Sequence, residues 1–181
     1  MRRGWYGALA ILCLLIVLQS CSKGGIPGPT APPAPTIANV AGVWAGVSTL
    51  TSATGCGCVG AAYQAWIGNT ANSTAQINQN GSAITARITD DTTGLWCDST
   101  GTIGSETFVL NTTDCASGGL RITCSNGNKR DIFQVSGSRQ GTVSGNSASG
   151  TGGDTYNCYN SITGANAGVL NLGISFRMNR G

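Results

Sequence analysis

The chain has 181 residues, which is enough for one domain of ordinary size. It holds 28 Gly, 8 Cys and no His, with only 10 basic and 7 acidic side chains. Such sparse charge excludes a polyelectrolyte tail and leaves no basic stripe of the kind that binds nucleic acid. Because His is the commonest general base and metal ligand, its absence argues against the usual catalytic and metal sites.

The first 20 residues have the pattern of a secretory signal peptide. Arg2 and Arg3 give a positive start, and an apolar run of 14 residues extends from Trp5 to Leu18. A membrane-spanning helix needs about 20 apolar residues, so this run is too short to span. We therefore predict a signal peptide over residues 1–20, which is removed during export.

The signal ends in Leu18-Gln19-Ser20-Cys21. This segment resembles the lipobox of bacterial lipoproteins, which has an aliphatic residue, a position that accepts many residue types, a small residue and then Cys. The resemblance implies cleavage before Cys21, a diacylglyceryl group on its thiol and an acylated amine, and two or three acyl chains anchor a protein stably. Because Ser22 replaces the Asp that often retains lipoproteins at the inner membrane, the resemblance favours the outer membrane. The alternative is an ordinary signal peptide with an incidental Cys.

A Pro- and Gly-rich segment follows the lipobox and holds all 5 prolines of the chain. Pro fixes φ and lacks an N–H donor, so this composition disfavours both helix and sheet. We predict that residues 21–36 form a partly extended tether of about 3 Å per residue. A Pro-rich ligand for a partner is the alternative. Removal of residues 1–20 leaves eight basic and seven acidic side chains, so strong steering toward nucleic acid or acidic lipid is not expected.

Residues 37–181 have the composition of a β domain. Apolar residues alternate with polar ones over 170–178 and 84–89, and this period of two predicts strands with one buried face. Asn80-Gly81 and Asn126-Gly127 each predict a tight hairpin, because Asn and Gly tolerate positive φ. Further strands are expected at 43–51, 62–67, 76–79, 96–102, 107–111, 120–123, 132–135 and 140–147.

Eight or nine short strands with closely spaced turns, and no helix pattern, predict an all-β domain. The expected architecture is an antiparallel up-and-down β-barrel of about 8 strands, and a β-sandwich is the alternative. The Gly-rich stretch 136–153 contains almost no large apolar residue. We expect it to form a polar hairpin or a mobile loop that adds little to the core.

Gly42-Val43-Trp44 lies on the first predicted strand. The spacing G-x-W at this place resembles the signature of the calycins, the group of lipocalins and avidins. The resemblance implies a barrel in which Trp44 closes one end and a basic residue near the C-terminus, Arg177, packs over it. Some bacterial lipocalins are themselves outer-membrane lipoproteins. Since the T-D-Y motif of lipocalins is absent, the resemblance supports the barrel more than any particular ligand.

Six cysteines remain besides Cys13 in the signal and Cys21 at the lipid site, and an even number in an exported chain predicts three disulfides. They are Cys56, Cys58, Cys97, Cys115, Cys124 and Cys158. Adjacent pairing of Cys56 with Cys58 would be strained, so each should take a distant partner. The preferred local bridge is Cys115–Cys124, which leaves Cys97 and Cys158 for the other two.

A metal or redox centre at Cys56-Gly57-Cys58 is the alternative, but it lacks His and the second ligand pair of a zinc site.

The sequence contains no recognisable catalytic constellation. A Ser-His-Asp triad is impossible without His, and Asp90-Asp91 before Thr92-Thr93-Gly94 indicates a turn rather than a site. We therefore predict a protein that is not an enzyme and has no cofactor or metal. A pair of facing carboxylates, as in glycosidases, is the remaining enzymatic alternative.

Aromatic residues are the remaining candidates for a binding site. Trp44, Trp66 and Trp96, with Arg177, are candidates for a barrel end or a ligand cavity, and the alternative is ordinary core packing. The sequence thus predicts a lipid-anchored, non-enzymatic barrel at the bacterial outer membrane that binds a small apolar molecule. The alternative is a structural or interaction module of the envelope that contacts protein or polysaccharide.

Overall fold

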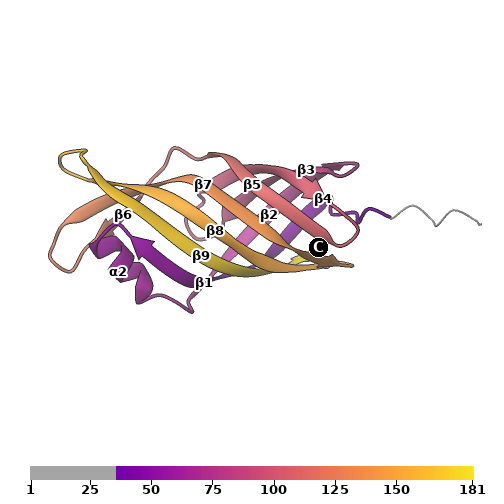
Figure 1. The fold of residues 1–181 in the computed structure, drawn as a ribbon, viewed down its shortest axis with the longest axis horizontal. Helices are drawn as coiled ribbons and strands as arrows, with labels where there is room; N and C mark the ends of the chain where they lie inside the picture. Colours follow the sequence, from indigo (N-terminus) through magenta and orange to yellow (C-terminus); the bar gives the residue numbers. More distant parts are fainter. Residues whose placement is uncertain (1–35) are drawn as a thin grey trace, which may run out of the picture. The chain divides into compact units, whose positions relative to one another are not determined.

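The computed structural model describes residues 36–181, and the predicted signal peptide, Cys21 and nearly all of the predicted tether lie outside them. This part of the chain forms nine strands and one short helix (Figure 1). The helix is α2 (Cys58–Gln64), and the strands are β1 (Gly42–Gly55), β2 (Thr70–Asn80), β3 (Ala83–Asp90), β4 (Trp96–Ile103), β5 (Thr107–Cys115), β6 (Leu120–Thr123), β7 (Lys129–Ser144), β8 (Ser147–Asn160) and β9 (Asn166–Arg180).

Eight of these strands close into an antiparallel barrel. Strands β5, β4, β3, β2, β1, β9, β8 and β7 are neighbours in this order, and β5 pairs with β7 to close the ring. β6 stands outside the ring and pairs with the first part of β7, where Leu120 lies opposite Ile132. The predicted antiparallel barrel is therefore confirmed, and the sandwich alternative is wrong.

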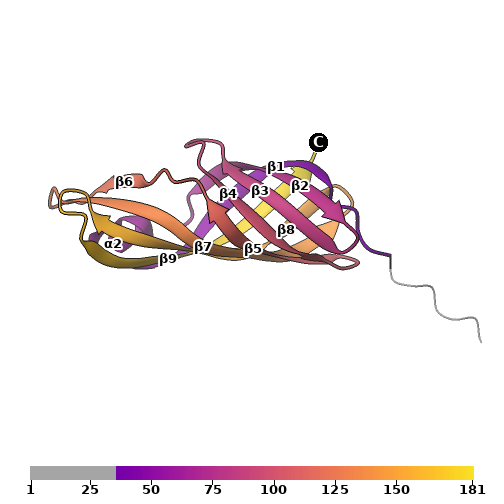
Figure 2. The ribbon, with the colours of Figure 1, turned by 90° about the horizontal axis from the view of Figure 1, so that it is seen from above.

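The strands differ in length, so part of the barrel wall extends beyond the rest at one end. β7, β8, β9 and β1 have 14 to 16 residues, whereas β3 and β4 have 8 each. The long strands therefore continue past the rim formed by the short ones. In Figure 2, α2 and β6 lie over this extension, away from the end where the described chain enters β1.

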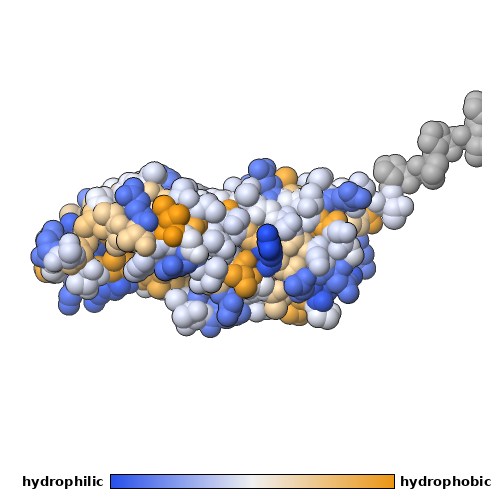
Figure 3. Space-filling model, turned by 90° about the horizontal axis from the view of Figure 1, so that it is seen from below, coloured by the Kyte–Doolittle hydropathy of each residue, from blue (hydrophilic) through white to orange (hydrophobic). Residues whose placement is uncertain are grey.

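Two hydrophobic clusters occupy the two ends. The first closes the end where the chain enters and centres on Trp44, which is 1% exposed and donates its indole N–H to the carbonyl of Val40 at 2.8 Å. The second lies under α2 and includes Val59, Cys158 and Leu170. We call the first the sealed end. On the face shown in Figure 3, hydrophilic, neutral and hydrophobic residues are interspersed over the outer surface.

The Gly-rich stretch 136–153 is part of the barrel wall. It forms the hairpin of β7 and β8, so the expected hairpin is right. It also contributes to the core, contrary to expectation, because Val143 and Ala148 pack into the cluster at the sealed end. Glycine is required where the strands come close: a Cβ on Gly141 would lie 2.2 Å from the carbonyl oxygen of Ser149.

Two expected strands are wrong. Residues 62–67 belong to the end of α2 and the turn after it, because Gly55, Cys56 and Gly57 all adopt positive φ and turn the chain out of β1. Residues 140–147 include the turn between β7 and β8 rather than one strand. Among residues 36–181, no helix has the length and apolar character needed to cross a membrane.

Candidate functional site

A cavity of about 410 Å³ lies inside the barrel, between the two hydrophobic clusters. At the rim opposite the sealed end, three segments line the cavity: the α2–β2 loop around Trp66, the β3–β4 loop around Thr93 and the segment after β5 around Gly118. We call this part of the cavity the mouth. Known pockets for small molecules measure about 300–1,000 Å³. The cavity is therefore large enough for a compact organic molecule.

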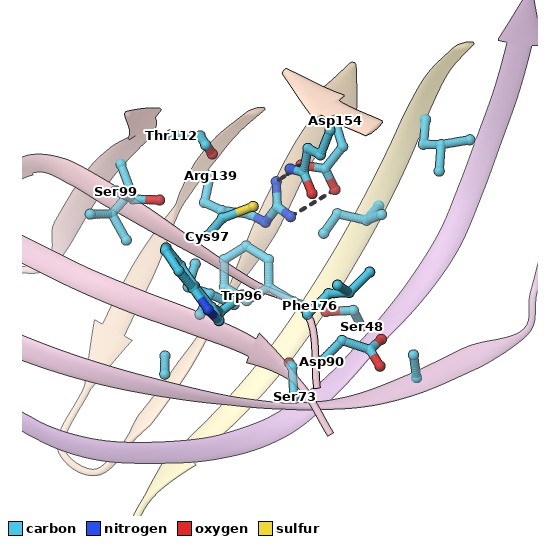
Figure 4. Close-up of a pocket in the computed structure, with 18 of the residues that line it drawn as sticks. Ser48, Ser73, Asp90, Trp96, Cys97, Ser99, Thr112, Arg139, Asp154 and Phe176 are labelled. Atoms are coloured by element: carbon cyan, nitrogen blue, oxygen red, sulfur yellow. Dashed lines mark hydrogen bonds and ion pairs between the residues drawn. The ribbon is translucent and has the colours of Figure 1, made fainter. Parts of the chain in front are cut away.

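The register of the strands determines which side chains line the cavity. Alternate residues point inward, so paired positions such as Ala75, Ile88 and Cys97 form an inner row across β2, β3 and β4. On the opposite wall, Arg139 pairs with Gly152 across β7 and β8. The wall carries apolar and aromatic side chains with a few polar ones between them (Figure 4).

Arg139 and Asp154 form a buried ion pair on this wall. The two guanidinium nitrogens Nη1 and Nη2 donate to Oδ1 and Oδ2 of Asp154, each at 2.8 Å, and the pair is drawn with dashed lines in Figure 4. Nε2 of Gln134 donates to Oδ1 of Asp154 at 2.8 Å. The side chains of Arg139 and Asp154 are only 17% and 8% exposed. Both charges are thus compensated by bidentate hydrogen bonding.

Glycines make room for this ion pair. A Cβ on Gly152 would lie 2.6 Å from Cδ of Arg139, and a Cβ on Gly137 would lie 2.5 Å from Oδ1 of Asp154. Any larger residue at either position would displace the charged side chains. The glycine content of β7 and β8 is therefore partly a requirement of the site.

Two groups stand out among the polar residues of the cavity, which is also lined by Asn69, Thr70, Asn72, Thr93 and Gln134. The ion-pair group consists of Ser99, Thr112, Arg139 and Asp154, and the Asp90 group consists of Ser48, Ser73 and Asp90. Figure 4 shows the two groups apart from each other, with Trp96 and Phe176 between them in the view. A ligand in the cavity therefore meets polar side chains on two walls and apolar ones elsewhere.

Asp90 supports the β3–β4 turn. Its Oδ1 accepts hydrogen bonds from the backbone N–H groups of Thr92 and Thr93, at 3.0 and 2.7 Å, and from the hydroxyl of Thr93 at 2.9 Å. The turn predicted from Asp90-Asp91 is thus confirmed. Asp90 also lines the cavity, so the same side chain stabilises the turn and contributes a charge to the site.

Two tyrosines of the cavity remain protonated near neutral pH. Burial, and then the charge of Asp90, raise the pKa of Tyr63. Burial is also the main cause that raises the pKa of Tyr156, and the carboxylate of Asp154 adds to it. Tyr63 lies beside Trp66 with ring centroids 5.0 Å apart and edge-to-face geometry. The cavity is therefore lined by neutral phenol groups, and Tyr63 and Trp66 present aromatic rings near the mouth.

The three candidate tryptophans border the cavity, but the candidate arginine does not. Trp44 lies at the sealed end and Trp66 at the mouth, and Trp96 carries the guanidinium of Arg87 4.0 Å over its ring. Arg177 is exposed and lies opposite exposed Val47, on the outer face.

The residue over Trp44 is Arg180, at 5.5 Å from the ring centroid, because Arg180 is the residue of β9 that lies opposite Trp44. The expectation for Arg177 is therefore corrected to Arg180.

All six cysteines of the domain are bonded, so the three predicted disulfides are confirmed. The bonds are Cys56–Cys158, Cys58–Cys124 and Cys97–Cys115. The preferred bridge Cys115–Cys124 is wrong, because β4 and β5 place Cys97 directly opposite Cys115 with 4.0 Å between the Cα atoms. Cys124, at the end of β6, bonds to α2 instead. Cys56 and Cys58 are each bonded to a distant cysteine, which contradicts the metal or redox alternative.

Sequence reasoning did not single out the ion pair or the buried serines. A signal for the ion pair is present in the glycine pattern: Gly137, Arg139 and Gly141 share the inner face of β7, and Gly150, Gly152 and Asp154 share that of β8. One charged residue in a row of inward glycines indicates a polar group in a lumen.

These features define a disulfide-bonded, closed eight-stranded antiparallel barrel with an internal cavity and charged side chains in its lining. No protein-family model, curated protein or solved structure matches the chain. Function therefore has to be inferred from the cavity.

Proposed function

We propose that the barrel binds a small, mainly apolar molecule in its cavity, without catalysis, while a lipid on Cys21 holds it at the bacterial outer membrane. The observation that carries the binding proposal is the cavity of about 410 Å³. Eight-stranded barrels are commonly filled by their own side chains. Here space remains between the two hydrophobic clusters.

Small inward residues keep this space open. Ala71, Ser73 and Ala75 face it from β2. Side chains around an apolar void lack packing partners, and this loss of dispersion contacts costs stability. A ligand of suitable shape restores those contacts and stabilises the folded barrel.

The lining favours binding over catalysis. Of the two carboxylates of the cavity, Asp154 is held by Arg139 and Gln134, and Asp90 accepts the hydrogen bonds of its turn on one oxygen only. A general acid or base needs a carboxyl that is free to exchange a proton with substrate. The glycosidase alternative therefore lacks a suitable pair among the residues that line the cavity.

Filling the cavity should abolish binding. Ser99 faces the cavity from β4 and is 4% exposed, so the substitution Ser99→Phe places a ring in the ligand's space. We expect neutral 4-phenyl-1-butanol to bind at least about tenfold more weakly, a loss of about 1.4 kcal/mol. Isothermal titration of the full chain in phosphatidylcholine nanodiscs, against empty discs, measures this.

Thr100→Phe is the matched control, since Thr100 is the next residue of β4 and is exposed; its binding should equal that of the unaltered protein. Equal binding by the Ser99→Phe variant, or no binding by the unaltered protein, contradicts the proposal.

The lipid anchor rests on the lipobox resemblance, and the three disulfides support export to an oxidising compartment. We expect the substitution Cys21→Ser to move the protein from the membrane fraction to the soluble fraction, because no acyl chain is then attached. Cell fractionation and immunoblotting measure this. Cys13→Ser, inside the predicted signal, serves as the control and should stay membrane-bound. Continued membrane retention of the Cys21→Ser protein contradicts the anchor.

A further inference from the structure

The charges that line the cavity do not balance. Three lining residues are charged, namely Asp90, Arg139 and Asp154. Arg139 and Asp154 compensate each other, which leaves the charge of Asp90. Among the residues that the structure describes, the ion pairs are Arg87–Asp98, Arg121–Asp131 and Arg139–Asp154, so Asp90 pairs with no described Lys or Arg.

One oxygen of Asp90 is left for a ligand. All three hydrogen bonds that the Asp90 side chain accepts in the β3–β4 turn go to Oδ1. Over residues 36–181, no donor reaches Oδ2. Asp90 lies directly opposite the inward-facing Ser73 in the β2–β3 ladder and lines the cavity with it. The uncompensated charge is therefore accessible from the cavity.

Buried hydroxyl groups form a second, independent observation. Ser73 and Ser99 are 9% and 4% exposed and line the cavity, yet neither hydroxyl has a hydrogen-bond partner among the described residues. Among the described residues, Ser161 carries the one side-chain oxygen that is both fully buried and unpartnered, so the hydroxyls of Ser73 and Ser99 are open to the cavity. Both hydroxyls can therefore accept hydrogen bonds from a molecule inside it. Figure 4 shows Ser73 close to Asp90 and Ser48 in the view.

Resting on the proposed function, we propose that the ligand is a cationic amphiphile, an organic ammonium with an apolar body, whose ammonium group lies against Asp90 and Ser73. An ammonium group has three donors and no acceptor. It matches a site made of one carboxylate oxygen and the hydroxyls of Ser73 and Ser48. The apolar body then lies against Ile88 and Phe176, which line the same cavity.

The aromatic mouth suits the same ligand. Tyr63 and Trp66 stand edge to face at the rim, and aromatic faces attract organic cations. A carboxylate ligand suits the cavity poorly, because the guanidinium of Arg139 is already held by both oxygens of Asp154. A fatty acid would meet two carboxylates and no free cation among the lining residues.

The test compares three probes of equal length: 4-phenylbutylamine, 4-phenyl-1-butanol and 4-phenylbutyrate. Isothermal titration uses the full chain in phosphatidylcholine nanodiscs at pH 7, with empty discs as blank. We expect the amine to bind about tenfold more tightly than the alcohol, as for a hydrogen bond to a charged group, and the carboxylate to bind most weakly. Tighter binding of the carboxylate overturns the inference but leaves cavity binding intact, whereas binding of none of the three overturns the proposed function itself.

Asp90→Asn isolates the charge, because the Asn oxygen can still accept the hydrogen bonds of the turn. We expect the dissociation constants of the amine and the alcohol for this variant to lie within about twofold of each other. Asp91→Asn is the matched control: it removes the same charge from the next, exposed residue and should keep the preference for the amine. The substitution Ser73→Ala leaves the turn unchanged and should weaken binding of the amine more than binding of the alcohol. An unchanged preference in the Asp90→Asn variant overturns the inference.

Discussion

Replacing Arg139 by Met is expected to lower the free energy of unfolding by about 3 kcal/mol. The substitution keeps a long apolar side chain on β7 but leaves the carboxylate of Asp154 buried, with only Gln134 as a side-chain donor. A buried charge without its partner loses its hydration and gains too little in return. Urea unfolding of the oxidised protein at pH 7, followed by Trp fluorescence, measures the change.

Two variants separate this effect from a general loss of charge. The double substitution Arg139→Met and Asp154→Leu removes both charges and should recover most of the lost stability, since buried pairs can often be replaced by apolar residues. Arg121→Met breaks the exposed pair with Asp131 and should change stability little. If the Arg139→Met protein is as stable as the Arg121→Met protein, the buried pair does not stabilise the barrel.

Replacing Cys56 and Cys158 together by Ala is expected to destabilise the domain by about 4 kcal/mol. This bond joins residues 102 apart in sequence and connects the segment before α2 to β8. Because both cysteines are buried, Ala is the least disruptive replacement. Without the bond, the unfolded chain gains the conformational freedom that a long closed loop had removed. Urea unfolding under non-reducing conditions measures the loss.

The bond Cys97–Cys115 provides the matched comparison. It closes a separation of only 18 residues, between neighbouring strands whose ladder already holds them together. Its double Ala variant should lose about 3 kcal/mol, less than the Cys56 and Cys158 variant. The reverse order would show that the length of the closed loop does not determine the contribution of these bonds.

The barrel could be predicted because its signals are local. The alternation over 170–178 lies within β9, and the alternation over 84–89 lies within β3. Hairpins form at both Asn-Gly sites, with positive φ at Gly81 and Gly127. The asparagines do not share this conformation, and Asn80 instead pairs with Ala83 at the end of β2. A period of two and a turn residue need only a few consecutive positions. Such short patterns can be recognised without knowing which distant strand pairs with them.

What could not be predicted depends on pairing between distant segments. α2 has seven residues, too few for a helical period to show. Cys97 meets Cys115 only through the register of β4 and β5. Gln134 reaches Asp154 only because a bulge between Gln134 and Ser136 shifts the register of β7 and β8. A bulge moves every later side chain relative to the partner strand, and no pattern in the sequence announces it.

The sealed end has a practical consequence for the use of this barrel. Nη1 of Arg180 donates to the carbonyl of Asn39 at 2.9 Å, and the N–H of Gly181 donates to that of Val43 at 3.3 Å, so both ends of the described chain meet at the closed base. The mouth opens at the other rim. A reporter domain or a solid support can therefore be joined after Gly181 without standing in the path by which a molecule enters or leaves.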